Sequence, residues 1–391
     1  MFLNLFIIFT FGILGGILFD KIKLPKLVWY LVLGILIGPS VFNVIDDSLL
    51  NISSYLRQIA LIIILTRSGL SLNIKNLKKI GRPAVLMCFI PACFEIMGVL
   101  ILGPLLLNIN YLESLLLGSV LAAVSPAIIV PRMIKLIEEG YGKDNKVAEL
   151  VLAGASVDDI FVIVLFYSFK GLVATNTFNL WNIVQIPISV VLGFLLGIVM
   201  GLFIVMIIKI IKTNLITNVI LILGLSFGMV YLEEILKPFI GVSALLAIIV
   251  MGLVVSLLMN DKAKEIQKTY NSMWNGFEIL LFVLVGVATN INYAFSNNGL
   301  IILSLIIITL VFRSLGVIVC LIATKFKLKE KIFIVLSYLP KATVQASIGA
   351  IALTEGLSCG DIVLTAAVIS ILFTAPIGAM LIDNTYKRLL N

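Results

Sequence analysis

Apolar residues form long runs along almost the whole chain, and short polar segments separate them. Most runs are about 20 residues long, the length that a helix needs to cross the roughly 30 Å hydrocarbon core of a bilayer. A membrane β-barrel would instead show alternating segments of about 10 residues. The pattern predicts an all-α polytopic membrane protein with thirteen transmembrane helices. They lie at about 2–19, 27–45, 53–71, 83–107, 113–136, 147–170, 181–211, 215–236, 238–259, 273–290, 298–323, 332–354 and 362–384.

The composition supports a membrane protein and the charges predict its orientation. Hydrophobic residues make up 61% of the chain, charged residues 12%, and the mean hydropathy is +1.20. Most of the 28 Lys and Arg residues lie in the loops that follow odd-numbered apolar runs or at the C-terminus. The loops on the opposite side of the membrane contain only Arg57, Lys170 and Lys237. Because cytoplasmic loops collect Lys and Arg, we expect the N-terminus outside and the C-terminus inside. The net charge of +8 then reflects topology and not nucleic-acid binding.

Five charged residues lie deep within the predicted helices, namely Glu95, Asp158, Asp159, Arg313 and Lys341. A charge that faces lipid costs at least about 2.5 kcal/mol, so such residues normally face a protein interior or a watery cavity. Three acids and two bases favour internal pairing. The chain has no histidine, so any proton carrier must be a carboxylate or a lysine.

These charges can serve structure or transport. We interpret Glu95 and Arg313 as a structural ion pair, since arginine does not release its proton in practice. Asp158 and Asp159 point about 100° apart on a helix, which gives them separate tasks. Lys341 is expected to pair with one aspartate, and the other is then free to bind and release a cation.

Prolines interrupt two of the predicted helices. Pro126 and Pro131 are expected to open one helix around 125–131, and Pro340 interrupts another. Irregular backbone in a membrane is tolerated only where protein or a water-lined cavity surrounds it, and its free carbonyls are ready ligands for small ions.

The two interrupted helices belong to a predicted inverted repeat. Glu95 lies one run before the first interruption and Arg313 one run before the second, and the two units start seven runs apart. An odd separation makes the units cross the membrane in opposite directions. We expect core repeats at 81–171 and 296–391, scaffold or dimerisation helices at 1–80 and 214–292, and a linker helix at 179–213.

Three motifs carry a resemblance to a known family: "VSPAIIVPRM", "GASVDDIF" and "LPKATVQA". They resemble the monovalent cation/proton antiporters of the double-aspartate branch and are most similar to the NHA-type sodium/proton exchangers, from about residue 60 to 385. The resemblance implies an NhaA-like antiporter fold and a homodimer with an elevator form of alternating access. It also implies that Asp159 carries the cation or the proton, that Lys341 holds Asp158, and that Glu95 and Arg313 tie the repeats together. Many double-aspartate relatives have a lysine where Arg313 stands, so their stoichiometry does not carry over.

The predicted function is secondary active exchange of Na⁺ or Li⁺ for H⁺, and not enzyme catalysis. Asp159 is the expected site of the transported metal ion. Further oxygen ligands are expected from the hydroxyls of Ser125 and Thr343 and from the carbonyls of 125–131. No cofactor and no nucleic-acid partner is expected. The lipid bilayer surrounds the chain, and the expected location is a prokaryotic plasma membrane.

Three other readings remain at this point. An intramembrane aspartyl protease also uses two buried aspartates, but on different helices and usually within a GxGD sequence, which is absent from this chain. A cation channel would need a continuous pore, which an inverted repeat with one acidic pair does not favour. A potassium/proton antiporter would give nearly the same sequence pattern.

Overall fold

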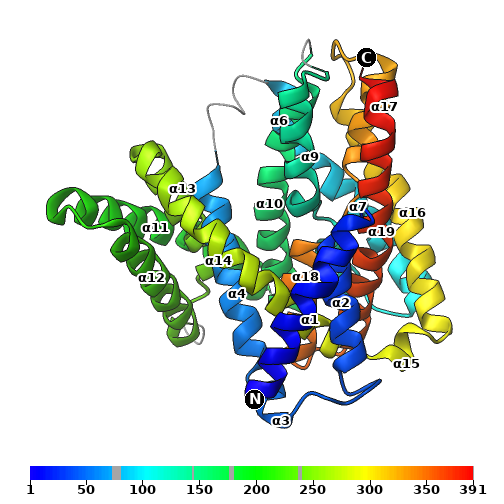
Figure 1. Ribbon diagram of the computed structural model, residues 1–391, viewed down its shortest axis with the longest axis horizontal. Helices are drawn as coiled ribbons and strands as arrows, with labels where there is room; N and C mark the ends of the chain where they lie inside the picture. Colours follow the sequence, from blue (N-terminus) through cyan, green and yellow to red (C-terminus); the bar gives the residue numbers. More distant parts are fainter. Residues whose placement is uncertain (73–80, 143–144, 176–179, 237–239, 391) are drawn as a thin grey trace. The chain divides into compact units, whose positions relative to one another are not determined.

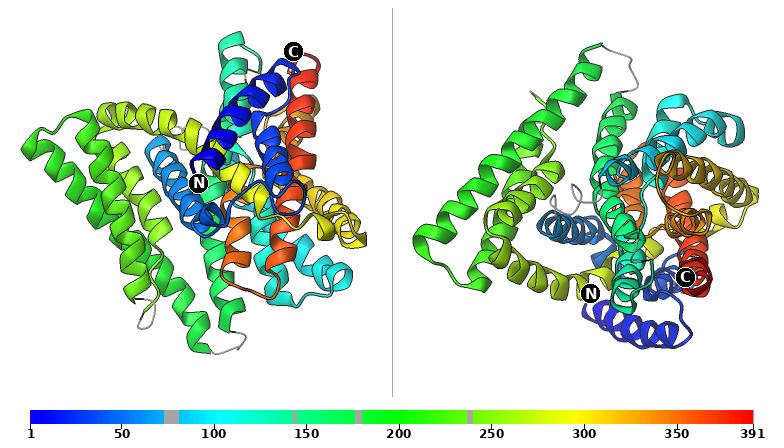
Figure 2. Two further views of the ribbon diagram at one scale, coloured as in Figure 1. Left: turned by 60° about the horizontal axis from the view of Figure 1, so that its bottom comes forward. Right: turned by 90° about the horizontal axis from the view of Figure 1, so that it is seen from above.

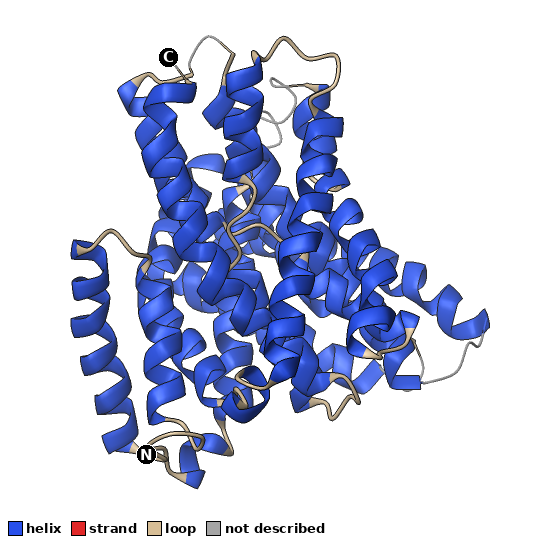
Figure 3. Cartoon of the chain, turned by 90° about the vertical axis from the view of Figure 1, so that its right-hand side faces the viewer, coloured by secondary structure: helices blue, strands red, loops and turns tan. Residues whose placement is uncertain are grey.

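The computed structural model describes residues 1–72, 81–142, 145–175, 180–236 and 240–390. Over these residues the chain is helical and contains no strand (Figure 3). Nine helices in the described part are long and apolar enough to cross a membrane, and shorter apolar helices lie at Lys26–Ile37, Ala244–Leu258 and Thr343–Thr354. The predicted all-α polytopic architecture is confirmed. Lys237, one of the residues used to predict the orientation, lies outside the described residues.

The chain divides into two compact units, and unit 1 contains residues 81–169 of the first predicted repeat and all of the second. It comprises Met1–Ser54, Lys75–Phe169 and Ile279–Asn391 (Figure 1). The first repeat consists of α6 (Arg82–Met87), α7 (Ile90–Leu107), α8 (Tyr111–Leu121), α9 (Pro126–Glu139) and α10 (Val147–Thr175). The second consists of α16 (Asn297–Cys320), α17 (Leu328–Ser337), α18 (Thr343–Thr354) and α19 (Gly360–Leu389). The same unit holds α1 (Phe2–Lys21), α2 (Lys26–Ile37), α3 (Asp47–Leu50), α15 (Ile291–Ala294) and the last part of α14 (Asn260–Val287).

Close packing of α7 against α16 brings the two repeats together within unit 1. A methyl group on Gly316 of α16 would lie 2.8 Å from the Cα atom of Pro91, and one on Gly98 of α7 would lie 2.9 Å from the ring of Phe312. The two backbones approach closely because glycine has no side chain at these positions. The α8 helix packs in turn on α18 and α19. Residues from both repeats are therefore neighbours in the middle of the unit.

Unit 2 comprises Tyr55–Ile74 and Lys170–Glu278. It contains most of α4 (Ser53–Ser71), α11 (Leu180–Ile211), α12 (Leu215–Leu236), α13 (Ala244–Leu258) and the first part of α14. The helices α11, α12 and α13 pack side by side (Figure 2). Glycines again permit close approach, since a methyl group on Gly197 of α11 would lie 2.6 Å from the carbonyl oxygen of Ala247.

The first interruption lies at 122–125, slightly before the position that the prolines suggested. Pro126 is the first residue of α9, where the missing N–H would have no helical partner in any case. Pro131 lies inside α9, which continues to Glu139. The second interruption, at 338–342 between α17 and α18, contains Pro340.

Candidate ion-binding site

Five charged side chains gather in unit 1 around the two interrupted helices. Glu95 comes from α7, Asp158 and Asp159 from α10, Arg313 from α16, and Lys341 from the segment that precedes α18. Four of them are fully buried, and Asp159 is 8% exposed. Charges at this depth require partners, because an isolated buried charge is costly.

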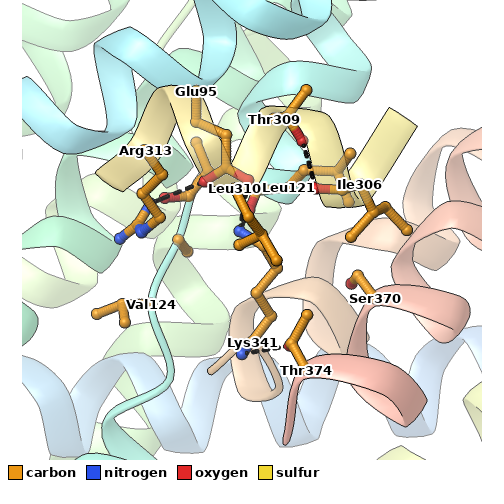
Figure 4. A network of polar contacts seen from close by, with 12 residues as sticks. Glu95, Leu121, Val124, Ile306, Thr309, Leu310, Arg313, Lys341, Ser370 and Thr374 are labelled. Carbon is orange, nitrogen blue, oxygen red and sulfur yellow. Dashed lines mark hydrogen bonds and ion pairs between the residues drawn. The ribbon is translucent and has the colours of Figure 1, made fainter. Parts of the chain in front are cut away.

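Arg313 pairs with two of the three acids of this charge cluster, and Figure 4 shows it beside Glu95. Its Nη1 atom lies 3.0 Å from Glu95 Oε2, and its Nη2 atom lies 3.0 Å from Asp158 Oδ2. The guanidinium also donates to backbone carbonyls in both interruptions, through Nε to Tyr338 at 2.7 Å and through Nη1 to Ala122. A planar guanidinium with several donors suits this task. Arg313 thus links two acids and both interrupted segments.

Lys341 pairs with Glu95 and not with Asp158, which corrects the pairing expected from the sequence (Figure 4). Its Nζ atom lies 2.7 Å from Glu95 Oε1 and also donates to the Leu121 carbonyl. Glu95 has two oxygens and offers one to each cation, whereas Asp158 Oδ2 is already bonded to Arg313. The backbone N–H of Lys341 donates to Thr374 Oγ1 at 2.9 Å, which fixes the start of the lysine side chain.

The adjacent aspartates have different environments. Asp158 Oδ2 accepts from Arg313 and from the backbone N–H of Val124 at 2.8 Å, so α10 is tied to the first interruption. Asp159 forms no ion pair within the described residues, and its Oδ1 atom is buried without a hydrogen-bond partner there. The cluster has three acids and two bases, and among the described residues Asp159 has no direct cationic partner.

The two interruptions contact each other through the backbone. The N–H of Ser125 donates to the carbonyl of Pro340 at 2.9 Å. Side chains of the second repeat donate to the carbonyls at the end of α8. Gln345 Nε2 donates to the Ala123 carbonyl at 2.8 Å. Arg313 donates to the Ala122 carbonyl, and Lys341 donates to the Leu121 carbonyl. Carbonyls at a helix end have no helical partner, and here side chains of the opposite repeat satisfy them.

The other predicted ligands lie at the starts of the two half-helices. Ser125 is the N-cap residue of α9, and its Oγ atom is fully buried with no hydrogen-bond partner in the described part of the chain. Thr343 is the first residue of α18 and is 2% exposed. The Ser125–Pro340 bond brings these two helix starts close to each other.

Sequence reasoning missed Gln345, Tyr338 and Thr374. Gln345 is a fully buried amide within the quoted motif "LPKATVQA", and a polar residue in an apolar helix was the available signal. Tyr338 contributes its backbone carbonyl, and Thr374 accepts a hydrogen bond from a backbone N–H. Nothing in the sequence pattern indicated either contact. Within the described residues no group of three or more His, Cys, Asp or Glu residues is arranged to hold a metal ion.

The fold and the site define a class: a helical membrane protein in which two interrupted helices meet at a buried cluster of charges. The structure titled sodium proton antiporter MjNhaP1 from Methanocaldococcus jannaschii at pH 8 superposes on the chain with a TM-score of 0.85. It covers 99% of this chain and 98% of its own, at 22% sequence identity, and so shares the fold.

The sequence identifies the family. It matches the family described as sodium/hydrogen exchanger, transmembrane, over residues 5–385. Sodium/hydrogen exchanger 9B2 of Mus musculus is 36% identical over 409 residues, which cover 99% of this chain and 74% of that protein. Sodium/hydrogen exchanger 9B1 of Homo sapiens is 32% identical over 416 residues, which cover 99% and 78%. The chain belongs to the sodium/hydrogen exchanger family, and the resemblance to monovalent cation/proton antiporters is confirmed.

Proposed function

We propose that this protein exchanges Na⁺, or Li⁺, for H⁺ across a membrane, and that both cargoes use Asp159. Family membership supports cation/proton antiport. One observation supports Asp159 as the shared site. Asp159 is nearly buried and has no cationic partner among the described residues, whereas the adjacent Asp158 pairs with Arg313. One free carboxylate can bind a cation or a proton in turn.

Coupling follows from the charge balance of the cluster. With Glu95, Asp158, Arg313 and Lys341 ionised, the two pairs cancel, and an ionised Asp159 leaves one negative charge. A proton or a monovalent cation neutralises this charge equally well. A site that crosses the membrane only when neutral must carry one cargo or the other, because an uncompensated charge in a low dielectric is costly. Leak is thereby suppressed.

The proposed ligands of the cation are oxygens, which hard cations prefer. Asp159 supplies the charged ligand, and Asp158 is its tethered neighbour. Ser125 and Thr343 supply hydroxyls from the starts of the half-helices. The partnerless Ser125 Oγ supports its role, since a buried hydroxyl normally finds a hydrogen bond.

The transport cycle is proposed to be of the elevator type, in a homodimer. The repeats at 81–171 and 296–391 would move as a core against the helices at 1–80 and 214–292, joined by the linker at 179–213. The ties between the repeats support their movement as one body. They include Arg313 with Glu95 and Asp158, and on the surface Arg132 Nη2 with Asp383 Oδ2 at 3.0 Å.

The proposed topology has thirteen spans with the N-terminus outside and the C-terminus inside, in a prokaryotic plasma membrane. Nine candidate spans, three shorter apolar helices and α4, all within the described part of the chain, support the span count. In unit 1 the start of α1 and the end of α19 lie at opposite ends (Figure 1), which agrees with an odd number of crossings.

The second candidate is exchange of K⁺ for H⁺, because a carboxylate, two hydroxyls and backbone carbonyls suit any monovalent cation of fitting size. A cation channel is less well supported. The ion pairs and backbone contacts between the interrupted helices fill the middle of unit 1 with protein groups.

Flux measurements in liposomes test the function. Purified protein is reconstituted with a pH-sensitive dye inside the vesicles, and Na⁺, Li⁺ or K⁺ is added with and without an ionophore that clamps the voltage. We expect proton movement that depends on Na⁺ or Li⁺ and disappears in Asp159→Asn. Cation flux without proton movement would indicate a channel, and a normal exchange rate in Asp159→Asn would refute the assignment of the site.

A further inference from the structure

A tyrosine hydroxyl occupies the space beside a glycine on α10. The glycine is Gly154, one turn before Asp158, and a Cβ atom added there would overlap Tyr338 Oη. It would also lie 3.2 Å from Tyr338 Cζ and 2.9 Å from Met87 Cβ. Residues four apart lie on the same face of a helix, so Gly154 and Asp158 face the same side of α10.

Tyr338 also contacts the charge cluster. Its carbonyl accepts from Arg313 Nε at 2.7 Å, and the guanidinium carbon of Arg313 lies 5.6 Å from its ring centroid, within the range of a cation–π contact. The side chain is fully buried, and its Oη atom has no hydrogen-bond partner in the described part of the chain. Among the described residues the hydroxyl therefore contributes a packing contact and not a hydrogen bond.

We infer that Tyr338 and Gly154 are positioning residues for the cation site. Their contact limits how closely α10 approaches the interruption between α17 and α18. A helix moves as a rigid element, so this limit also places Asp158 against Arg313 and sets the position of Asp159, the next residue of α10. The inference rests on the proposed function of Asp159, and it adds a determinant of sodium affinity that lies outside the charged residues.

A different result is expected if the contact between Tyr338 and Gly154 serves only to stabilise the fold. If Tyr338 and Gly154 only fill space, their substitution lowers thermal stability and leaves the apparent sodium affinity of the folded protein unchanged. Positioning predicts a change in sodium affinity, because ligands must be held within about 0.5 Å of their productive geometry.

The test compares Gly154→Ala with Gly171→Ala. Gly171 is on the same helix, and a methyl group there meets no atom within 4 Å. Sodium KM and maximal rate are measured in proteoliposomes, and the sodium dependence of thermal stability is measured on the same monodisperse preparations. We expect Gly154→Ala to raise the sodium KM by about tenfold or more and Gly171→Ala to behave as the wild type. A wild-type KM in Gly154→Ala overturns the inference.

Tyr338→Phe supplies the second test, since it removes the hydroxyl and adds no atom. Alone, it should raise the sodium KM by about two- to threefold, because the Tyr338 hydroxyl no longer limits the approach of α10 at Gly154. Thermal stability should stay at the wild-type value. Combined with Gly154→Ala, it should recover part of the lost affinity, since Met87 Cβ remains close. An unchanged KM in Tyr338→Phe, or a double variant as impaired as Gly154→Ala, contradicts the inference. Absence of sodium-dependent exchange in the wild type would instead refute the proposed function.

Discussion

Asp158 and Asp159 are neighbours in sequence with different surroundings. The 100° step between successive helix residues predicted separate tasks for them. In the structure Asp158 is bonded to Arg313 and Val124, and Asp159 has no ion pair within the described residues. The helix period predicts that the two carboxylates point in different directions, because it is a local property, but it does not identify Arg313 as the partner of Asp158.

The partner of Lys341 could not be predicted in the same way. Two buried cations and three buried acids allow several pairings, and the choice depends on which oxygens face which nitrogen. Glu95 offers separate oxygens to Lys341 and to Arg313, an arrangement set by the packing of α7 on α16. Composition and spacing contain no information on that geometry.

The Lys341–Glu95 pair predicts a specific coupling between two substitutions. Glu95→Gln leaves a buried lysine without its charged partner and should lower the free energy of unfolding by about 3–5 kcal/mol. Lys341→Gln in the same chain should recover part of this loss. Thermal unfolding of the four proteins in detergent gives the coupling energy. The matched cycle of Lys341→Gln with Asp158→Asn should show weaker coupling, and stronger coupling there would restore the pairing expected from the sequence.

At the scale of elements, the interruptions of α8–α9 and α17–α18 depend on each other. Prolines indicated that two helices are broken, but Pro126 begins a half-helix and Pro131 lies within one. The gap itself falls on "AAVS" at 122–125, whose backbone groups bond to Arg313, Gln345, Asp158 and Pro340. Its location is thus fixed by tertiary contacts, which a local pattern does not contain.

Arg313 holds these elements together, and lysine should not replace it. A lysine side chain holds all of its donors on one nitrogen, whereas Arg313 uses three nitrogens to contact Glu95, Asp158 and Tyr338. We expect Arg313→Lys to lower the free energy of unfolding by about 3 kcal/mol, measured by thermal unfolding. The control is Arg132→Lys, at a partly exposed pair with Asp383, where a change of at most about 1 kcal/mol is expected. Equal losses in both variants would contradict the central role of Arg313.

At the scale of the whole molecule, the charge bias of the loops predicts an orientation that can be measured. Asn298 is exposed at the start of α16, and Lys329 is exposed at the start of α17, the helix that follows the other end of α16. Cysteines at these positions, in a background without the half-buried Cys93, should react with a membrane-impermeant maleimide from opposite sides. We expect Asn298→Cys to react in intact cells and Lys329→Cys only after permeabilisation. The reverse pattern would invert the proposed topology.

The grouping of helices was the part of the whole molecule least open to sequence reasoning. The repeats were predicted from prolines and charges, and unit 1 contains all of the second and the first as far as Phe169. The same unit also contains α1 and α2, where a methyl group on Gly12 would lie 2.7 Å from a side-chain atom of Ile279. Such contacts join residues far apart in the chain, and hydropathy along the chain does not record them.

The central claim is that one carboxylate, Asp159, binds either the cation or the proton. The most direct measurement is the sodium KM of wild-type proteoliposomes over a range of pH, with Asp159→Asn as the inactive control. Competition predicts that, on the acid side of the profile, the sodium KM rises by about tenfold for each unit by which the pH falls. The reason is that one proton competes with one cation at each site. Saturating sodium should restore the same maximal rate at each pH. A sodium KM that is independent of pH, with a maximal rate that falls toward acid, would show that the proton binds elsewhere.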